Sequence, residues 1–437
     1  YFQWMDYEDE KRQDVLYGFP QKLVSYPLPG TVVPPWLAEG SAQYMFEGAN
    51  WDHWDSHRDM ILRDRAINDN LLSFTEMNTF GKKGIGNEST YNAGFSLCSF
   101  IAENYGSDAL KQIMVELSNP LQFSIDKAIM KVTGINGFQL YEDFKGSIEI
   151  KYNEKTQSIR SNEVKGEILV TKGTTNLHPK WSPDGKKIVY ISNKENDYFN
   201  QTDLFLYDLD KQESEKLDGG ALFAPAWHPS GNAIYYTKKP IIPNKYGSRF
   251  FDIYEYNLEK KKEKRLTKFQ RAYNPVFISS DSSLAFLSTH DGSQNIYYLN
   301  LKTEKITQLT DFDDHSILRG LSYDSENHRL LYNRTMHHYR DIYYYSLTDS
   351  TTDVIIANEL WDERDVHYSN GALIYSDDRS GVYNLRINDE YYVTNVTGGA
   401  FMPDVNDNGD VVYSLYENGQ YKIVLLSEPH IIENDNV

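Results

Sequence analysis

Trp181-Ser182-Pro183-Asp184-Gly185-Lys186-Lys187-Ile188-Val189-Tyr190 is the clearest copy of a pattern that returns along the rest of the chain. Within it, Pro183 fixes φ, the Asp184 side chain can hydrogen-bond its own turn, and Gly185 tolerates a positive φ. The residues after the turn alternate from one face to the other with the period of a β-strand. The stretch therefore predicts a β-hairpin.

The hairpin pattern is found six times in all. The second copy, residues 227–236, keeps the tryptophan, the proline and the glycine of the first. Four weaker copies follow at residues 277–286, 321–332, 366–375 and 405–413. The interval between copies is about 40 to 50 residues, which is the length of a propeller blade repeat.

A second strand pair is expected after every hairpin. Its best copy is Asp203-Leu204-Phe205-Leu206-Tyr207-Asp208-Leu209, with parallels at residues 252–258, 295–299, 341–345 and 421–425. Four short strands per repeat indicate a β-propeller. One blade cannot bury both faces of its sheet, so the blades must stack around an axis and close into a ring.

The segment before the first hairpin, Gly166-Glu167-Ile168-Leu169-Val170, has no hairpin of its own. We expect it to complete the last blade as its outermost strand. The segment would then join the two ends of the ring.

From residue 177 to residue 188, and again in the strand at residues 203–209, the chain closely resembles the repeat of TolB-type propellers, a WD40-like repeat. The resemblance covers about the last two thirds of the chain. It is strongest in the first two blades and weakens from the third, where Ser280-Asp281-Ser282 replaces Pro-Asp-Gly. It implies a six-bladed periplasmic or secreted propeller that binds other proteins.

The length and the charge of the chain limit the number of domains and the functions that it can have. The 437 residues indicate two or three domains, at about 150 residues per domain. The formal net charge of −19 argues against nucleic-acid binding, because a phosphate binder needs a basic face. No stretch reaches the roughly 18 apolar residues of a membrane-spanning helix.

Cys98 is the only cysteine, so no disulfide can form within the chain. It lies in the apolar run of residues 95–101 and is expected to be a small buried hydrophobic residue rather than a nucleophile. The chain opens on Tyr1-Phe2-Gln3-Trp4 without a methionine. We therefore expect an internal start, with a targeting segment and more sequence upstream.

The residues before the propeller are expected to be mostly helical. Prolines at a helix start and glycines at helix ends help to place the elements. Helices are predicted at residues 34–46, 52–67 and 88–105, from residue 107, and at 124–132 and 138–155, with a polar linker at 156–165. The expected fold class is multidomain, α plus all-β. It comprises a helical domain at residues 1–160 and a six-bladed β-propeller at residues 161–437.

Glu39 is the carboxylate of most interest, because it lies in an otherwise apolar predicted helix. From residue type alone, such a partly buried acid is more often paired or capped than functional. Residues 36–44, 91–95 and 105–110 resemble the second half of a gluzincin metallopeptidase domain of the peptidase MA-like kind. The resemblance implies that Glu39 is the third zinc ligand and that Tyr91 donates a hydrogen bond to the oxyanion.

These residue types fit zinc chemistry. A catalytic zinc takes three protein ligands and a water whose pKa it lowers, and a phenol can stabilise the tetrahedral intermediate. The two zinc-binding histidines and the general-base glutamate should lie upstream, in a His-Glu-x-x-His helix. No histidine precedes Glu39, so either that helix lies outside this chain or the site has been lost. Zinc is expected only in a longer protein.

Other motifs give weaker signals. His53 and His57 have the spacing that places two imidazoles on one helix face, but no glutamate follows the first, and we expect surface or packing residues. The glycine-rich loop at residues 81–86 follows a helix rather than a strand, which argues against phosphate binding. His337 and His338 are expected in a solvated turn. The chain has no Gly-x-Ser-x-Gly elbow, which excludes a serine peptidase of the prolyl oligopeptidase type.

Two functions are compatible with these patterns. One is a binding protein, in which the propeller holds a protein or peptide partner. The other is an active zinc-dependent metallopeptidase, in which the propeller recruits or filters substrate. For the chain as given we prefer the binding function, because its residues cannot complete the metal site. Whether the longer protein is an enzyme is left open.

Overall fold

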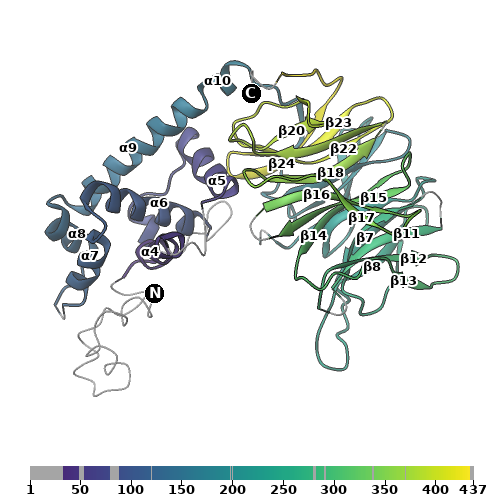
Figure 1. Ribbon diagram of the computed structural model, residues 1–437, viewed down its shortest axis with the longest axis horizontal. Coiled ribbons are helices and arrows are strands. Elements are labelled where there is room, and N and C mark those ends of the chain that lie inside the picture. The colour runs from purple at the N-terminus through teal and green to yellow at the C-terminus, as the bar shows by residue number, and fades with distance from the viewer. Residues whose placement is uncertain are drawn as a thin grey trace. The chain divides into compact units, whose positions relative to one another are not determined.

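The computed structural model describes residues 33–48, 54–78, 88–119, 121–196, 198, 200–278, 282–289, 292–336, 339–369 and 371–433. The chain divides into two compact units, residues 1–157 and residues 158–437. Helices make up the regular structure described in the first unit and strands most of that in the second, as the labels in Figure 1 show.

The helical unit has its helices where the sequence predicts them. The described α-helices are α4 (Pro35–Gly48), α5 (Ser56–Ile67), α6 (Glu88–Tyr105), α7 (Ala109–Leu117), α8 (Ile125–Thr133), α9 (Gly137–Lys155) and α10 (Gln157–Ser161), with one 3-10 turn, η1 (Glu76–Asn78). The first six α-helices correspond to the six predicted ones. Helix α10 differs, because it lies within the predicted linker. Its one buried apolar side chain, Ile159, gives no helical periodicity that a sequence pattern could reveal.

Local hydrogen bonds explain where several helices begin and end. The Asp55 side chain accepts a hydrogen bond from the backbone nitrogen of Arg58 at 2.8 Å and so begins α5. The Asn136 side chain accepts from the backbone nitrogen of Gln139 in the same way at the start of α9. Gly134 ends α8 with a φ of 84°, a left-handed conformation that favours glycine. The predicted stop at this glycine is confirmed.

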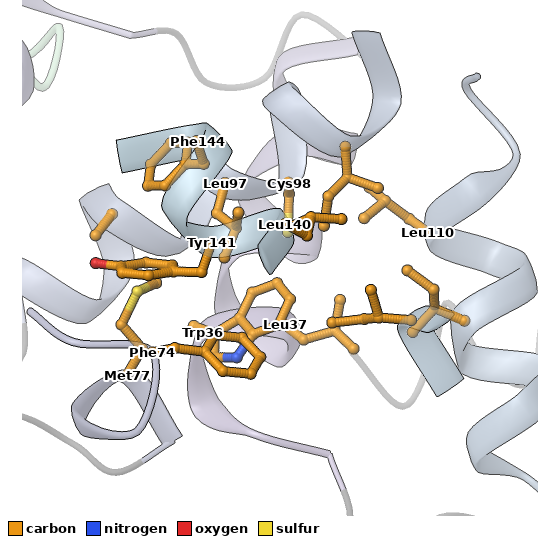
Figure 2. Packing of buried hydrophobic residues seen from close by; sticks show 14 of the residues in the cluster. Trp36, Leu37, Phe74, Met77, Leu97, Cys98, Leu110, Leu140, Tyr141 and Phe144 are labelled. Carbon is orange, nitrogen blue, oxygen red and sulfur yellow. The ribbon is translucent and has the colours of Figure 1, made fainter. Parts of the chain in front are cut away.

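One apolar core holds the helical unit together, and Figure 2 shows part of it. Side chains from α4, α6, α7 and α9 meet there, with Phe74 and Met77 from the segment around η1. Cys98 is fully buried among them, and burial raises the pKa of its thiol. The prediction of a small buried hydrophobic residue is confirmed.

The second unit consists of six four-stranded antiparallel sheets. Five sheets use strands consecutive in the sequence, and the sixth takes its outer strand from the start of the unit. In blade order the strands are β2 (Asn176–Trp181), β3 (Lys187–Ser192), β4 (Asp203–Asp208), β5 (Glu213–Asp218); β6 (Ala221–Trp227), β7 (Ala233–Lys238), β8 (Asp252–Asn257), β9 (Lys262–Arg265); β10 (Ala272–Phe277), β11 (Ser283–Ser288), β12 (Asn295–Asn300), β13 (Ile306–Gln308); β14 (Ile317–Asp324), β15 (Arg329–Met336), β16 (Tyr339–Ser346), β17 (Thr352–Ile356); β18 (Glu363–Ser369), β19 (Ala372–Asp377), β20 (Asn384–Ile387), β21 (Tyr391–Tyr392); and β22 (Gly399–Val405), β23 (Val411–Glu417), β24 (Gln420–Leu426), β1 (Glu167–Val170).

The first strands of the six blades form a closed ring. Strand β2 contacts β6, β6 contacts β10, and so on through β14 and β18 to β22, which contacts β2 again. At the outer edge of the last blade β1 pairs with β24, with Ile168 opposite Val424. This pairing covers an edge that would otherwise be exposed. The six-bladed β-propeller and the outermost position predicted for the segment before the first hairpin are both confirmed.

The six predicted hairpins join the first and second strands of the six blades. In the first, Gly185 has a φ of 67° and its backbone nitrogen donates to the carbonyl oxygen of Ser182 at 2.9 Å, which confirms the turn. Among the third strands of the six blades, β20 in the fifth blade is the one for which sequence analysis gave no range. It carries Arg386, which is fully buried and lies 3.2 Å from the Asp377 carboxylate, so the strand lacks a clean apolar alternation.

Candidate functional site

Every inner strand of the propeller carries a β-bulge. The pairing register with the second strand of the blade shifts there in all six blades. One residue at each bulge has a φ between 50° and 62°: His178, Phe223, Asn274, Gly320, Asp365 and Met402. A bulge redirects side chains, and left-handed residues other than glycine gather at functional sites. All six residues line one cavity on the axis of the ring.

We call this cavity the arginine cavity, because Arg319, Arg340 and Arg364 line it together with the six bulge residues and Lys180. Its volume is about 220 Å³. Asp365 is the acidic residue among those that line it in the described part of the chain. A basic cavity thus lies on the axis of a chain with a net charge of −19.

A second cavity, the aromatic cavity, has a volume of about 260 Å³. Five blades contribute one aromatic side chain each to its lining: Trp181, Trp227, Phe277, Tyr323 and Tyr368. The two tryptophans are the residues that open the two strongest copies of the sequence repeat. The repeat therefore encodes the lining of the axial channel as well as the hairpin.

The two cavities are parts of one channel, because Lys180, Ala224 and Leu321 line both. At the junction the Asp404 carboxylate lies 2.8 Å from Lys180 Nζ and accepts a hydrogen bond from the backbone nitrogen of Trp181 at 2.7 Å. Asp404 belongs to the last blade and Lys180 to the first. The junction therefore also fastens the ends of the ring.

Two histidines in the channel are neutral at neutral pH. Burial lowers the pKa of His178 to about 4, although Asp365 acts in the opposite direction. Burial likewise lowers the pKa of His367 to about 4, although the Asp404 carboxylate lies 3.2 Å from its Nδ1. The fixed positive charge of the channel comes from lysine and arginine alone.

The predicted residues Glu39 and Tyr91 lie on α4 and α6, and both are half-buried. The two helices cross at very short range through Gly40 and Gly94. A Cβ atom on Gly40 would lie 2.3 Å from the Gly94 carbonyl carbon, and one on Gly94 would lie 2.6 Å from the Trp36 carbonyl oxygen. The glycines of both peptidase-like segments thus have a packing role. The structure brings together the helices that carry the two predicted residues.

The described residues do not complete a metal site. Within them, no group of three or more His, Cys, Asp or Glu side chains is placed to hold a metal ion. Glu39 alone does not meet the requirement of a catalytic zinc for three protein ligands. His57 lies on α5, whereas His53, the glycine-rich loop at residues 81–86 and the His337-His338 pair lie outside the described residues.

Sequence reasoning did not single out the arginines of the channel. Arg319 and Arg364 directly precede the bulge residues Gly320 and Asp365. Arg340 is the second residue of β16. Arg319 and Arg340 belong to the fourth blade and Arg364 to the fifth, so their convergence depends on strand pairing within one sheet and on the packing of two neighbouring blades. An arginine directly before the bulge residue in two of the six blades, the fourth and the fifth, was the signal available.

Comparisons with known proteins find similarity to TolB and to solved β-propellers. No protein-family model matches the chain. Over 94 residues the chain is 37% identical to the "Tol-Pal system protein TolB" of Ruthia magnifica subsp. Calyptogena magnifica, which covers 21% of this chain and 20% of that protein. The chain thus matches about a fifth of the length of that curated relative.

Solved propellers show weaker likeness. TolB from Acinetobacter baumannii is 18% identical over 58% of this chain and 55% of its own, with a TM-score of 0.38. The β-propeller domain of the trilobed protease from Pyrococcus furiosus is 15% identical over 60% and 83%, with a TM-score of 0.41. The six sheets and their closure establish the propeller independently of these likenesses. None of the described helices is long and apolar enough to cross a membrane.

Proposed function

We propose that the chain is a binding protein whose propeller holds a protein or peptide partner at its axial channel. The observation that carries the proposal is the channel itself, which presents five aromatic side chains at one end and three arginines at the other. Tryptophan, tyrosine and arginine are the residues that most often dominate binding energy at protein interfaces. The local similarity to a Tol-Pal system protein supports the same class of function.

The size of the channel suits side chains of an extended segment rather than a large ligand. The aromatic cavity of about 260 Å³ and the arginine cavity of about 220 Å³ adjoin along the channel, so each can take a different side chain of one extended segment. Proline and aromatic residues of the aromatic cavity lose little conformational entropy on binding. A periplasmic or secreted location, as expected from the TolB-type resemblance, is part of the proposal.

Site-specific photo-crosslinking tests this proposal. A photoreactive amino acid is placed at Ala226, which lines the aromatic cavity, and in a second variant at Lys302, in the exposed turn after β12. In an extract of cells that produce the protein, we expect a discrete polypeptide adduct at position 226 and none at 302. The purified partner should then bind the whole chain, and Trp227→Ala should weaken this binding. Equal adducts at both positions, or no adduct at 226, would refute channel binding.

A zinc-dependent peptidase is the second candidate, favoured by the close crossing of α4 and α6 that brings the helices of Glu39 and Tyr91 together. In a protein that joins this chain to an upstream His-Glu-x-x-His helix, Glu39 would be the third ligand and Tyr91 the oxyanion donor. The measurement is zinc content by mass spectrometry. Glu39→Gln should lower it, whereas Glu103→Gln, on the exposed side of α6, should not. Equal zinc in both variants, or none in the parent, would eliminate this candidate.

A further inference from the structure

We infer that the arginine cavity binds one carboxylate group, held between Arg319 and Arg340, and that the partner in the proposed function supplies it from an acidic side chain or a chain terminus. The inference rests on the proposed function, because it names the chemistry that this site would recognise in the partner. It goes further by predicting a single charged group at a defined position in the channel.

The three guanidinium groups of the cavity are not in equal environments. Arg364 lies 3.1 Å from the Asp362 carboxylate and stacks on the ring of Tyr383 at 4.6 Å and that of Phe401 at 5.7 Å. Its charge is therefore paired and its planar face is covered, while its buried Nε has no hydrogen-bond partner among the described residues. Arg364 forms part of the wall of the cavity.

Arg319 and Arg340 have no such carboxylate. Within the described part of the chain, no Asp or Glu oxygen forms an ion pair with either side chain. Arg319 lies 6.0 Å from the Tyr273 ring, and Arg340 Nε donates to Thr335 Oγ1 at 3.4 Å. Both side chains line the same cavity, so a planar anion could accept hydrogen bonds from both.

The surroundings of Arg340 disfavour its positive charge. Burial lowers its pKa to about 10, and the positive charge of Arg364 acts in the same direction. Asp362 and Asp365 act in the opposite direction but do not restore the usual value. Like charges held together in a partly buried site are stabilised by an added anion. The cavity is therefore organised to bind a negative group.

The charge balance of the channel favours a carboxylate. Lys180 and the three arginines supply four positive charges, while Asp362, Asp365 and Asp404 supply three negative ones. The surplus is a single positive charge, because both channel histidines are neutral at pH 7. One carboxylate neutralises it, whereas a phosphate, with a charge of about −1.5 to −2, would exceed it.

The carboxylate that lines the cavity, that of Asp365, is already engaged. Asp365 Oδ2 accepts a hydrogen bond from the backbone nitrogen of Met402 at 3.2 Å, which links the fifth blade to the sixth. Turning this side chain toward the arginines would break that link. The missing negative group must then come from outside the cavity wall.

Thermal unfolding of the whole chain at pH 7 and constant ionic strength tests the inference with four probes. They are N-acetylglutamate amide, which has one side-chain carboxylate, its uncharged glutamine analogue, acetate and inorganic phosphate. A ligand that binds the folded state raises the melting temperature in a saturable way. We expect this for N-acetylglutamate amide, a weaker effect for acetate and phosphate, and none for the glutamine analogue.

Matched variants locate the binding. Arg319→Gln and Arg340→Gln should each weaken N-acetylglutamate amide binding at least about tenfold, the loss of one charge-assisted contact. Arg249→Gln removes a charge from the exposed loop after β7 and should change binding by less than about twofold. Arg319 is exposed, so its variant should fold even if the Arg340 variant does not.

Each outcome bears on the inference. An equal response to the glutamine analogue, tighter binding of phosphate, or unchanged binding in both cavity variants would overturn it. Acetate binding as tight as N-acetylglutamate amide would show that a free carboxylate suffices and overturn the polypeptide source. These results are distinct from the crosslinking test, because an adduct at position 226 could persist without any carboxylate specificity at the arginine cavity.

Discussion

Lys180 Nζ lies 2.8 Å from Asp404 Oδ1, and this ion pair joins the inner strand of the first blade to that of the last. The side chains are 25% and 9% exposed, so the pair is largely protected from solvent. Asp404 also accepts the backbone nitrogen of Trp181. Ring closure is thus secured at the axis by Asp404 and at the rim by the pairing of β1 with β24.

We therefore predict that Asp404→Ala lowers the free energy of unfolding by about 1.5–3 kcal/mol, the usual contribution of hydrogen bonds to a charged group. Urea unfolding followed by circular dichroism measures the change. Glu215→Gln breaks an ion pair with Lys261 in which both side chains are more than half exposed, and it should leave the midpoint unchanged. Equal midpoints for the two variants would show that the axial pair does not stabilise the ring.

The architecture of the propeller could be predicted because its information is local. Each hairpin is specified by a turn such as the one at Gly185, the interval between hairpins gives the length of a blade, and the number of hairpins gives the number of blades. The prediction failed where a strand departs from its pattern, as β20 does because it buries Arg386. It failed in the linker because Ile159 alone anchors α10.

The channel could be predicted only in part. Trp181 and Trp227 stood out as repeat residues, and the structure shows that they line the aromatic cavity. Arg319 and Arg340 lie outside the copies of the repeat, on β14 and β16 of the fourth blade. Both strands pair with β15, and the pattern of a single strand does not reveal that this pairing brings the two arginines to one cavity. Glu39 was identified by resemblance to a family, and its metal role stays a prediction.

The crossing of α4 and α6 leads to a prediction about Gly94. A methyl group there would meet the Trp36 carbonyl oxygen at 2.6 Å, so Gly94→Ala must separate the two helices. We expect the free energy of unfolding to fall by about 1–3 kcal/mol, as is typical of overpacking. Hydrogen exchange measured by mass spectrometry should become faster in both helices. Gly146→Ala is the matched control, because a Cβ atom there meets nothing within 4 Å in α9. The control should be stabilising by about 0.5–1 kcal/mol, as alanine replaces glycine in a helix.

Glu363 leads to a prediction about pH. The residue is fully buried, and burial raises the pKa of its carboxyl to about 8, with Asp341 and Asp377 acting in the same direction. The ordinary pKa of this carboxyl is 4.5, so between pH 4.5 and about 8 the unfolded chain has released a proton that the folded state still holds. Stability from this group is complete below pH 4.5 and is lost as the pH rises to about 8.

Glu363→Gln keeps the shape of the side chain and removes the titration. We expect the variant to be more stable than the parent at pH 8 by about 2–5 kcal/mol, with a smaller difference at pH 5. Burial also raises the pKa of Asp377 to about 6, so some pH dependence below pH 6 should persist in the variant. Denaturant midpoints between pH 5 and pH 8 measure this. Glu304→Gln changes a side chain that is 76% exposed, and the midpoint of this variant should change with pH as that of the parent does. A parent whose stability does not fall between pH 6 and pH 8 would contradict the prediction.

Asp59 leads to the opposite pH dependence in the helical unit. Its carboxylate accepts hydrogen bonds from Arg63 at 2.7 Å, from the Tyr152 hydroxyl at 2.8 Å and from Lys155 at 2.9 Å. Burial acts to raise its pKa, but Arg63 and Lys155 together hold the pKa below its ordinary value of 3.8. The stabilisation is therefore present above pH 3.8 and is lost as the pH falls through the lower, folded value.

Removing the Asp59 carboxylate should lower the free energy of unfolding at neutral pH. In Asp59→Ala the fully buried Arg63 loses the carboxylate that lies 2.7 Å from it. We expect the free energy of unfolding to fall by about 3–5 kcal/mol at pH 7. The difference from the parent should narrow below pH 3.8, where the parent carboxylate begins to be protonated. Hydrogen exchange of α5 and α9 at several pH values reports this for the helical unit alone. Asp143→Asn, at an exposed carboxylate of α9, should change exchange little at any pH, because its hydrogen bond with Gln139 lies in solvent. A constant difference from pH 7 to pH 3 would mean that Asp59 stabilises the unit through packing rather than through its charge.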